Sequence, residues 1–282
     1  MFKSISDCVW AFDIEWVPDP EAGRRIYGLP IDLTDAEVRS EMWKRGGASE
    51  AEPQPYLKTV LCRVVSVAAV IRKKRSDGTI KLDLTSLPKP PDHPQPEPEL
   101  LCTFLSSLGK ARPQLVGFNS AGSDLPILIQ RGIARGIAAP EFCKRPDKPW
   151  EGSDYFIRYG DDHVDLKDVV CGSGRATFPS LHELAEVSGI PGKIDSTGED
   201  VVALWSEGSI KRIVEYNEFD ALTTYLVWLR VAHFGGFLSP EQYRHEESLV
   251  FALLRSRTER GDFYFTPYLQ RWKHLRDGPW FE

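Results

Sequence analysis

The 282-residue sequence predicts an α/β domain in which helices flank a mixed, five-stranded sheet. Five segments are rich in the β-branched and aromatic residues that favour strands, and three of them precede the first long helical pattern. This early group indicates antiparallel pairing, whereas a later strand–helix–strand order indicates parallel strands beside it. The predicted strands span residues 9–17, 60–72, 79–84, 115–119 and 163–169.

The first 98 residues contain three of these strands and an insertion. The strand 9–17 is apolar and aromatic, and the proline-rich residues 18–58 follow it as an insertion. Within the insertion, Thr34 begins a capping-box pattern that predicts a helix ending near Arg45. A Ser-Asp-Gly turn at 76–78 joins the next two strands into a hairpin. The six prolines within 88–98 indicate an extended loop rather than a polyproline recognition segment.

The rest of the chain is mostly helical. Residues 140–161 are expected to be irregular, and no internal repeat or clear second domain boundary is visible. We assign residues 1–238 to one domain and 239–282 to a C-terminal helical extension packed on that same domain. The predicted helices span 97–108, 124–135, 180–188, 200–206, 209–233 and 240–260.

Composition limits the classes of partner and compartment. The chain has 35 basic and 41 acidic residues, a net charge of −6 that argues against a protein coating duplex DNA. Its five cysteines include no closely spaced pair, so we expect neither disulfides nor a thiolate zinc site. This cysteine usage is typical of a protein in the reducing cytoplasm. The longest apolar run, 64–71, is far shorter than a membrane span, so no membrane association is expected.

Two carboxylates stand on the first strand. Asp13 and Glu15 are two residues apart, so their side chains point to the same face. Two like charges on a core strand are costly unless something compensates, and a divalent cation such as Mg²⁺ or Mn²⁺ would do so. The alternative is that one carboxylate is exposed at the strand end and the other is paired with a basic side chain.

Two further acids lie at positions that suit a site. Asp124 follows the fourth strand and opens a helix, either as a simple N-cap or facing a cleft at the carboxyl edge of the sheet. Tyr216 and Asp220 are four residues apart on the long helix and share one face of it. They could serve a site or could be a buried, hydrogen-bonded pair.

Taken in order, these residues form a pattern: Asp-x-Glu, Asn-x4-Asp and Tyr-x3-Asp. The chain thereby resembles the DEDD (DnaQ-like) 3′-5′ exonucleases, which have a ribonuclease H-like fold. Within them it is similar to the tyrosine branch and to stand-alone predicted exonucleases related to the proofreading domain of B-family DNA polymerases. The resemblance covers about residues 8–235 and is carried by 12–15, 118–126, 163–166, 181–193 and 216–230.

The resemblance implies a role for each acid and for the tyrosine. Asp13 would bridge two divalent ions, Mg²⁺ or Mn²⁺, with Glu15 and Asp220 completing the shell of the first. Asp124 would act on the second ion, and Tyr216 would orient the attacking water. The chain departs from the family at Ser123, where a large apolar residue is expected before Asp124.

Three further residues are expected to contact substrate. Trp16 either stacks on the terminal base or covers the core, and Asn119 belongs to the second motif. Lys193 ends a Gly-Ile-Pro-Gly-Lys turn and could lie near a backbone phosphate. Two other residues are expected to be structural. Asp165 is expected to cap the segment that follows it rather than to support a metal shell. His163 is expected to be a packed, hydrogen-bonded side chain rather than a metal ligand.

The expected function is therefore a metal-dependent 3′-5′ exonuclease acting on single-stranded ends, with DNA favoured over RNA. The expected partner is the 3′ end of a single nucleic-acid strand, and a polymerase or repair protein as a further partner stays open. Two alternatives stay open, namely an enzyme that trims RNA 3′ ends and a non-catalytic module that binds nucleic-acid ends.

Overall fold

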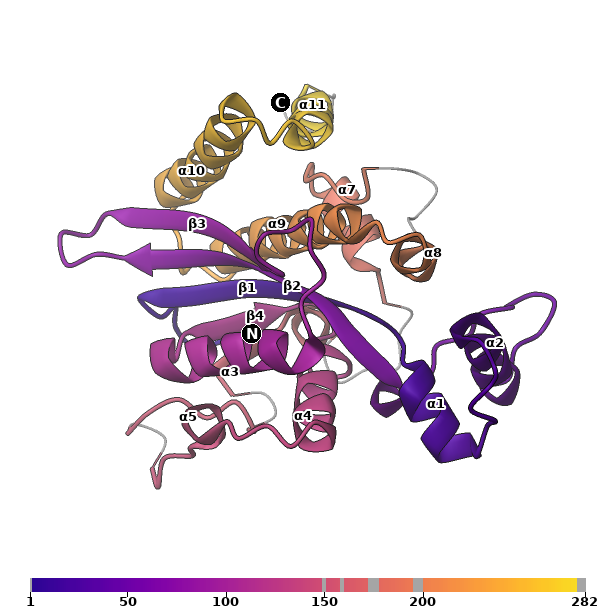
Figure 1. Cartoon of the computed structure of the whole chain (residues 1–282). Coiled ribbons are helices and arrows are strands. Elements are labelled where there is room, and N and C mark those ends of the chain that lie inside the picture. The colour runs from indigo at the N-terminus through magenta and orange to yellow at the C-terminus, as the bar shows by residue number, and fades with distance from the viewer. Residues whose placement is uncertain (1, 149–150, 158–159, 172–177, 195–199, 278–282) are drawn as a thin grey trace.

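The sheet has the order β3-β2-β1-β4-β5, in a computed structural model that describes residues 2–148, 151–157, 160–171, 178–194 and 200–277. The central strand β1 (Cys8–Pro18) pairs antiparallel with β2 (Cys62–Lys74), which pairs antiparallel with β3 (Ile80–Leu87). On its other side β1 is parallel to β4 (Gln114–Gly117), which is parallel to β5 (His163–Asp165). The mixed, five-stranded α/β fold of the ribonuclease H-like class is thus confirmed (Figure 1).

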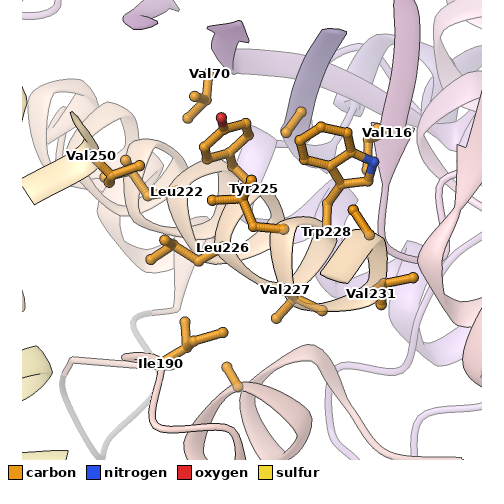
Figure 2. Close-up of a cluster of buried hydrophobic side chains, with 14 of the residues drawn as sticks. Val70, Val116, Ile190, Leu222, Tyr225, Leu226, Val227, Trp228, Val231 and Val250 are labelled. Atoms are coloured by element: carbon orange, nitrogen blue, oxygen red, sulfur yellow. The ribbon is translucent and has the colours of Figure 1, made fainter. Parts of the chain in front are cut away.

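Helices cover both faces of the sheet (Figure 1). On one face, α9 (Ile210–Phe234) lies against β1 and β2, and Tyr225 and Trp228 point toward Val70 and Val116 of the sheet (Figure 2). On the other face, α3 (Glu97–Ala111) and α4 (Asp124–Ala134) bury a second cluster around Phe104.

The alternation of β1 assigns its residues to these two clusters. Val9 and Ala11 belong to the α9 cluster, whereas Trp10, Phe12 and Ile14 belong to the α3 cluster. Because side chains alternate along a strand, Asp13 and Glu15 fall on the α9 face with Val9 and Ala11. The carboxylates of β1 and the long helix therefore meet on the same side of the sheet.

The insertion contains two helices instead of the one expected. Helix α2 (Asp35–Arg45) has the predicted capping box at Thr34. Helix α1 (Pro20–Tyr27) precedes it, capped by the Asp19 side chain and with proline at its first position. The two helices pack closely, because Gly23 lies against Met42 and a Cβ there would approach the Met42 sulfur to 2.5 Å.

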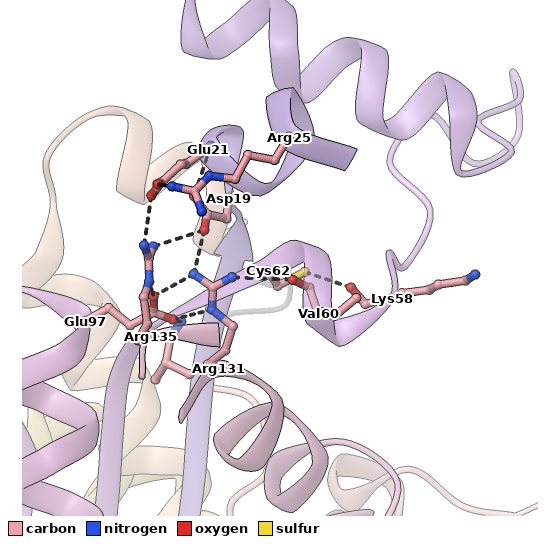
Figure 3. Close-up of polar contacts among 10 residues, drawn as sticks. Asp19, Glu21, Arg25, Lys58, Val60, Cys62, Glu97, Arg131 and Arg135 are labelled. Carbon is pink, nitrogen blue, oxygen red and sulfur yellow. Dashed lines mark hydrogen bonds and ion pairs between the residues drawn. The ribbon is translucent and has the colours of Figure 1, made fainter. Parts of the chain in front are cut away.

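An ion network buried at the start of α1 fixes the insertion to the core (Figure 3). The Arg131 guanidinium of α4 bonds Asp19 at 2.5 Å and Glu97 of α3 at 2.6 Å, and all three side chains are at least 96% buried. Arg135 adds bonds to Asp19 at 3.2 Å and to Glu97 at 2.8 Å. Charges this deeply buried need partners, so the network holds the base of the insertion in one position.

Two predicted strands end earlier in the structure, and a stretch predicted to be irregular contains a helix. The fourth strand stops at Gly117, because Asn119 adopts a left-handed conformation with φ of 62°. The fifth strand stops at Asp165, since its carboxylate accepts the Lys167 N–H and begins α6 (Leu166–Cys171). The stretch expected to be irregular contains α5 (Pro140–Cys143), whose backbone packs on Gly109 of α3.

The remaining helices lie on the α9 side, except for the short helix η1, which lies against α4 and α1. The short helices are η1 (Thr59–Leu61), α7 (Leu181–Val187) and α8 (Val201–Ser206). Helices α10 (Pro240–Glu259) and α11 (Phe265–Arg276) add Val250 and Trp272 to the same cluster as Tyr225, and residues 278–282 lie outside the described part. Among the helices that the structure describes, none has the length and apolar character needed to cross a bilayer. All five cysteines are free thiols.

Candidate active site

Asp13 and Glu15 lie on the half of β1 that leads to the insertion. Their partners in the β2 ladder are the small residues Ala68 and Ser66, which leave space on this face of the sheet. The register with β2 shifts directly after Glu15, at Trp16. Such an irregularity bends a strand and changes the direction of nearby side chains, and it is common next to active sites.

Asp220 of α9 completes a cluster of three carboxylates. One oxygen from each of Asp13, Glu15 and Asp220 lies within 4.8 Å of the others, although Asp13 and Asp220 are far apart in the chain. Carboxylate oxygens are hard ligands of the kind that Mg²⁺ and Mn²⁺ prefer. The chemistry of this donor set therefore fits a divalent cation.

Asp124 lines the same cleft, although its helix α4 packs on the face of the sheet opposite to α9. The cleft has a volume of about 420 Å³ and is lined by Asp13, Glu15, Asp124, Tyr216 and Asp220 together. Asp124 is the first residue of α4, and its Oδ2 accepts a hydrogen bond of 2.7 Å from the Ser123 hydroxyl. The serine that departs from the family pattern thus holds the carboxylate directly.

The four carboxylates have raised pKa values because they are buried close to one another. Burial is the largest cause for each, and repulsion from neighbouring acids adds to it at Asp13, Glu15 and Asp124. The pKa is raised to about 7 at Asp124 and to about 6 at Asp220. The amine of Lys193 acts in the opposite direction and lowers the pKa of Glu15 and Asp220. When these acids ionise, the cleft gains an excess of negative charge, which bound cations would compensate.

Tyr216 stands one helical turn before Asp220. Its hydroxyl hydrogen-bonds the Asp220 carboxylate, which lowers the pKa of Asp220. Burial and the surrounding acids raise the pKa of Tyr216 itself above its ordinary value of 10. The phenol therefore stays protonated near neutral pH and acts as a hydrogen-bond donor, not as a base.

Asn217 is a site residue that sequence reasoning missed. It is fully buried on α9, and its Nδ2 donates a 2.7 Å hydrogen bond to Asp13 Oδ2. The Ser66 hydroxyl of β2 lies 3.1 Å from the Asn217 Oδ1 and fixes the amide orientation. The available signal was the position of Asn217 directly after Tyr216, in a segment already assigned to the inward side of the helix.

The three expected substrate contacts are placed differently from one another. Trp16 and Lys193 line the cleft with the acids. Asn119 does not line it, since its Oδ1 accepts a hydrogen bond of 3.2 Å from Lys167 Nζ and its backbone N–H is bonded by Asp165. Asn119 instead shapes the turn that leads from β4 to Asp124.

Asp165 and His163 have the structural roles expected of them. The Asp165 carboxylate accepts backbone N–H groups of Asn119, Ala121 and Lys167, so it caps α6 and also ties down the turn before α4. His163 is buried, lies 2.8 Å from the Ser120 hydroxyl, and has a pKa lowered to about 4 by burial. It is therefore neutral and packed.

Comparison with known proteins places the chain in a family. Residues 54–272 match the model of a family described as predicted 3′-5′ exonucleases related to the exonuclease domain of PolB. The chain belongs to this family. The matched range contains Asp124, Tyr216 and Asp220, and the structure brings β1, which precedes that range, against them. No curated protein matches the sequence.

Among solved structures, the chain is similar to the family B DNA polymerase of the hyperthermophilic archaeon Pyrobaculum calidifontis. The TM-score is 0.46 at 18% sequence identity, over 78% of this chain and 24% of the polymerase. The chain thus corresponds to about a quarter of the length of that polymerase, and a similarity at this level does not identify a shared activity.

Proposed function

We propose that the protein is a metal-dependent 3′-5′ exonuclease that hydrolyses phosphodiester bonds at the 3′ end of single-stranded nucleic acid, with DNA as the favoured substrate. The observation that carries the proposal is the meeting of four carboxylates, one buried and three partly buried, with Tyr216 in one open cleft. Clustered acids whose pKa values are raised well above the ordinary range are characteristic of functional sites. Membership in a family of predicted 3′-5′ exonucleases supports the direction and the bond type.

The donor set fits two cations, Mg²⁺ or Mn²⁺. Asp13, Glu15 and Asp220 would hold one of them, and Asp124 would hold the other together with Asp13. Such a pair of ions would supply an activated water and stabilise the charge on the leaving 3′ oxygen. Their positive charge would also let a net-acidic protein bind a polyanion.

The chain's own side chains would position the reactants. Tyr216 stays protonated near neutral pH, and its hydroxyl would orient the attacking water by accepting a hydrogen bond from it while donating to Asp220. Asn217 holds the Asp13 carboxylate in one orientation, and Ser123 does the same for Asp124. Lys193 is a basic side chain at this cleft and could meet a backbone phosphate there.

DNA is favoured because the family is defined by its relation to a domain of a DNA polymerase. RNA trimming would use the same hydrolytic groups, and the outcome depends on how the cleft accommodates the 2′-hydroxyl. The free cysteines support the cytoplasm as the compartment.

The test uses 5′-labelled single strands of DNA and RNA of equal sequence, with Mg²⁺, Mn²⁺ or a chelator. We expect a ladder that shortens from the 3′ end only with metal, and faster on DNA. Asp220→Asn should abolish it, whereas the matched Asp83→Asn change, at an exposed position of β3, should not. Faster loss of the RNA strand would indicate an RNA-trimming enzyme. Binding without shortening in either metal would contradict the exonuclease and indicate an end-binding module.

A further inference from the structure

The insertion forms one side of the cleft that contains the acids. Trp43 of α2 and Tyr56, in the segment before η1, line the same cleft as Asp13 and Asp220. Trp16 of β1, Phe118 and Tyr216 lie in this cleft as well, so five aromatic side chains share it with the carboxylates. We refer to Trp43 and Tyr56 as the aromatic wall.

The aromatic wall stands on a fixed support. The network of Asp19, Arg131 and Glu97 holds the start of the insertion, and Val38, Met42 and Leu61 form a small core beneath it (Figure 3). At the far side, Arg39 of α2 donates a hydrogen bond of 3.2 Å to the Ser206 hydroxyl of α8. The wall is therefore tied to the sheet at one side of the cleft and to α8 at the other.

The rings of the wall remain accessible in this rigid setting. Tyr56 is 91% exposed and Trp43 is partly exposed. A single exposed aromatic residue needs no explanation, but several that line one cleft indicate a surface that binds something apolar or aromatic. Since Tyr56 is almost completely in solvent, it contributes little to the packing of the insertion.

The charges of the cleft limit how a strand could bind there. Among the described residues that line it, five are acidic and Lys193 alone is basic. A strand would gain little from contacts between its phosphates and basic side chains in this cleft, which are the usual source of affinity. Stacking of bases on aromatic rings is the other general source of affinity for single strands, and it tolerates any sequence.

We propose that Trp43 and Tyr56 form a stacking platform for the bases of a single strand close to its 3′ end. This inference rests on the proposed function, because it assigns the strand that enters the same cleft. It also gives a reason for selecting single strands, since the faces of paired bases in a duplex are covered by their neighbours. Trp43 lies before the range shared with the family, whereas Tyr56 lies just inside it.

The experiment removes the ring from the protein and the base from the ligand, separately and together. The probe is a 5′-fluorescein thymidine strand with a phosphorothioate linkage at its 3′ end to slow hydrolysis, in Mn²⁺. A second set of strands carries an abasic site at each of the nucleotides next to that end in turn. Binding is measured by anisotropy for the full-length protein, Tyr56→Ala, Tyr56→Phe and Ile31→Ala. Ile31 is the matched control because it is 87% exposed in the same insertion and does not line the cleft.

We expect the unmodified protein to lose about tenfold in affinity when one particular base is removed. Tyr56→Ala should lose about tenfold on the complete strand and nothing further on that abasic strand. Tyr56→Phe and Ile31→Ala should behave as the unmodified protein. Three results would each overturn the platform. Tyr56→Ala could bind the complete strand as tightly as the unmodified protein does, the losses of affinity from removing the ring and from removing the base could add independently, or the protein could bind no strand at all.

A hydrolysis assay on an unmodified strand separates this inference from the proposed function. A protein that shortens the strand but shows no coupling between Tyr56 and a base is an exonuclease without the platform. A protein that shows the coupling but never shortens the strand has the platform and is not an exonuclease.

Discussion

Asn217 of α9 donates a 2.7 Å hydrogen bond to Asp13 of β1, and it thereby joins the helix and the strand that supply the three clustered acids. Asn217→Ala should lower metal affinity or hydrolysis about 10–100-fold, as is typical when a partner of a ligand is removed. Calorimetry with Mn²⁺ and rates on single-stranded DNA measure the two effects. Thr223→Val, another buried change on α9 outside the cleft, is the control, and equal losses in both variants would refute the positioning role.

Tyr216→Phe separates water positioning from metal binding. The phenol is protonated near neutral pH, so we expect its loss to lower the hydrolysis rate about 100-fold without changing the pH at which the rate is half-maximal. Mn²⁺ affinity should stay within about threefold, because the carboxylates remain. A shifted pH profile, with the rate at its plateau unchanged, would instead identify Tyr216 as a titrating base.

The metal-free protein should become less stable as pH rises from 6.5 to about 8. The pKa of Asp124 is raised from 3.8 to about 7, and those of Asp13 and Glu15 are raised well above their ordinary values. The folded chain therefore holds protons that the unfolded chain releases. As a result, the free energy of unfolding falls as pH rises, until the pH exceeds the pKa values of these acids in the folded chain. His163 has the opposite effect only below its ordinary pKa of 6.5.

Thermal unfolding in chelator measures this trend. Tm should fall as pH rises from 6.5 to about 8, and Asp124→Asn should reduce this fall. Added Mn²⁺ should raise Tm more at the higher pH than at the lower one. A Tm that rises over this range would mean that the four acids do not dominate the titration of the folded state.

Arg131→Ala tests how the insertion is held. The change leaves the carboxylates of Asp19 and Glu97 buried with a reduced set of partners, and we expect a loss of about 3–5 kcal/mol in the free energy of unfolding. Denaturant unfolding gives the value. Arg25→Ala, which removes an exposed pair with Glu21, should have little effect, and similar losses in the two variants would contradict the account.

Local patterns in the sequence were sufficient for several parts of this structure. The alternation of β1 predicted that Asp13 and Glu15 share a face, and the capping box at Thr34 predicted the start of α2. The N-cap and proline at 19–20 were equally available signals for α1, but prolines elsewhere in the insertion favoured an irregular interpretation. Both helices follow from side chains close in sequence to the backbone groups they satisfy.

Other features depend on contacts that no local pattern reveals. The hydrogen bond between Asn217 and Asp13 joins residues of the last long helix and the first strand, and the network around Arg131 joins three separate segments. Asn119 was expected at the substrate because of its motif, yet its left-handed backbone and its bond to Lys167 keep it in the turn. Such placements follow from tertiary packing, which overrides residue type.

The most direct test of the central claim is release of the terminal nucleotide from a single DNA strand labelled at its 3′ end. We predict that the labelled mononucleotide appears in Mg²⁺ or Mn²⁺, is absent in chelator, and is absent for Asp220→Asn, which removes one of the three clustered acids. Release that persists in chelator or in Asp220→Asn, or internal cleavage of the strand before its 3′ end is lost, would contradict a metal-dependent 3′-5′ exonuclease in this cleft.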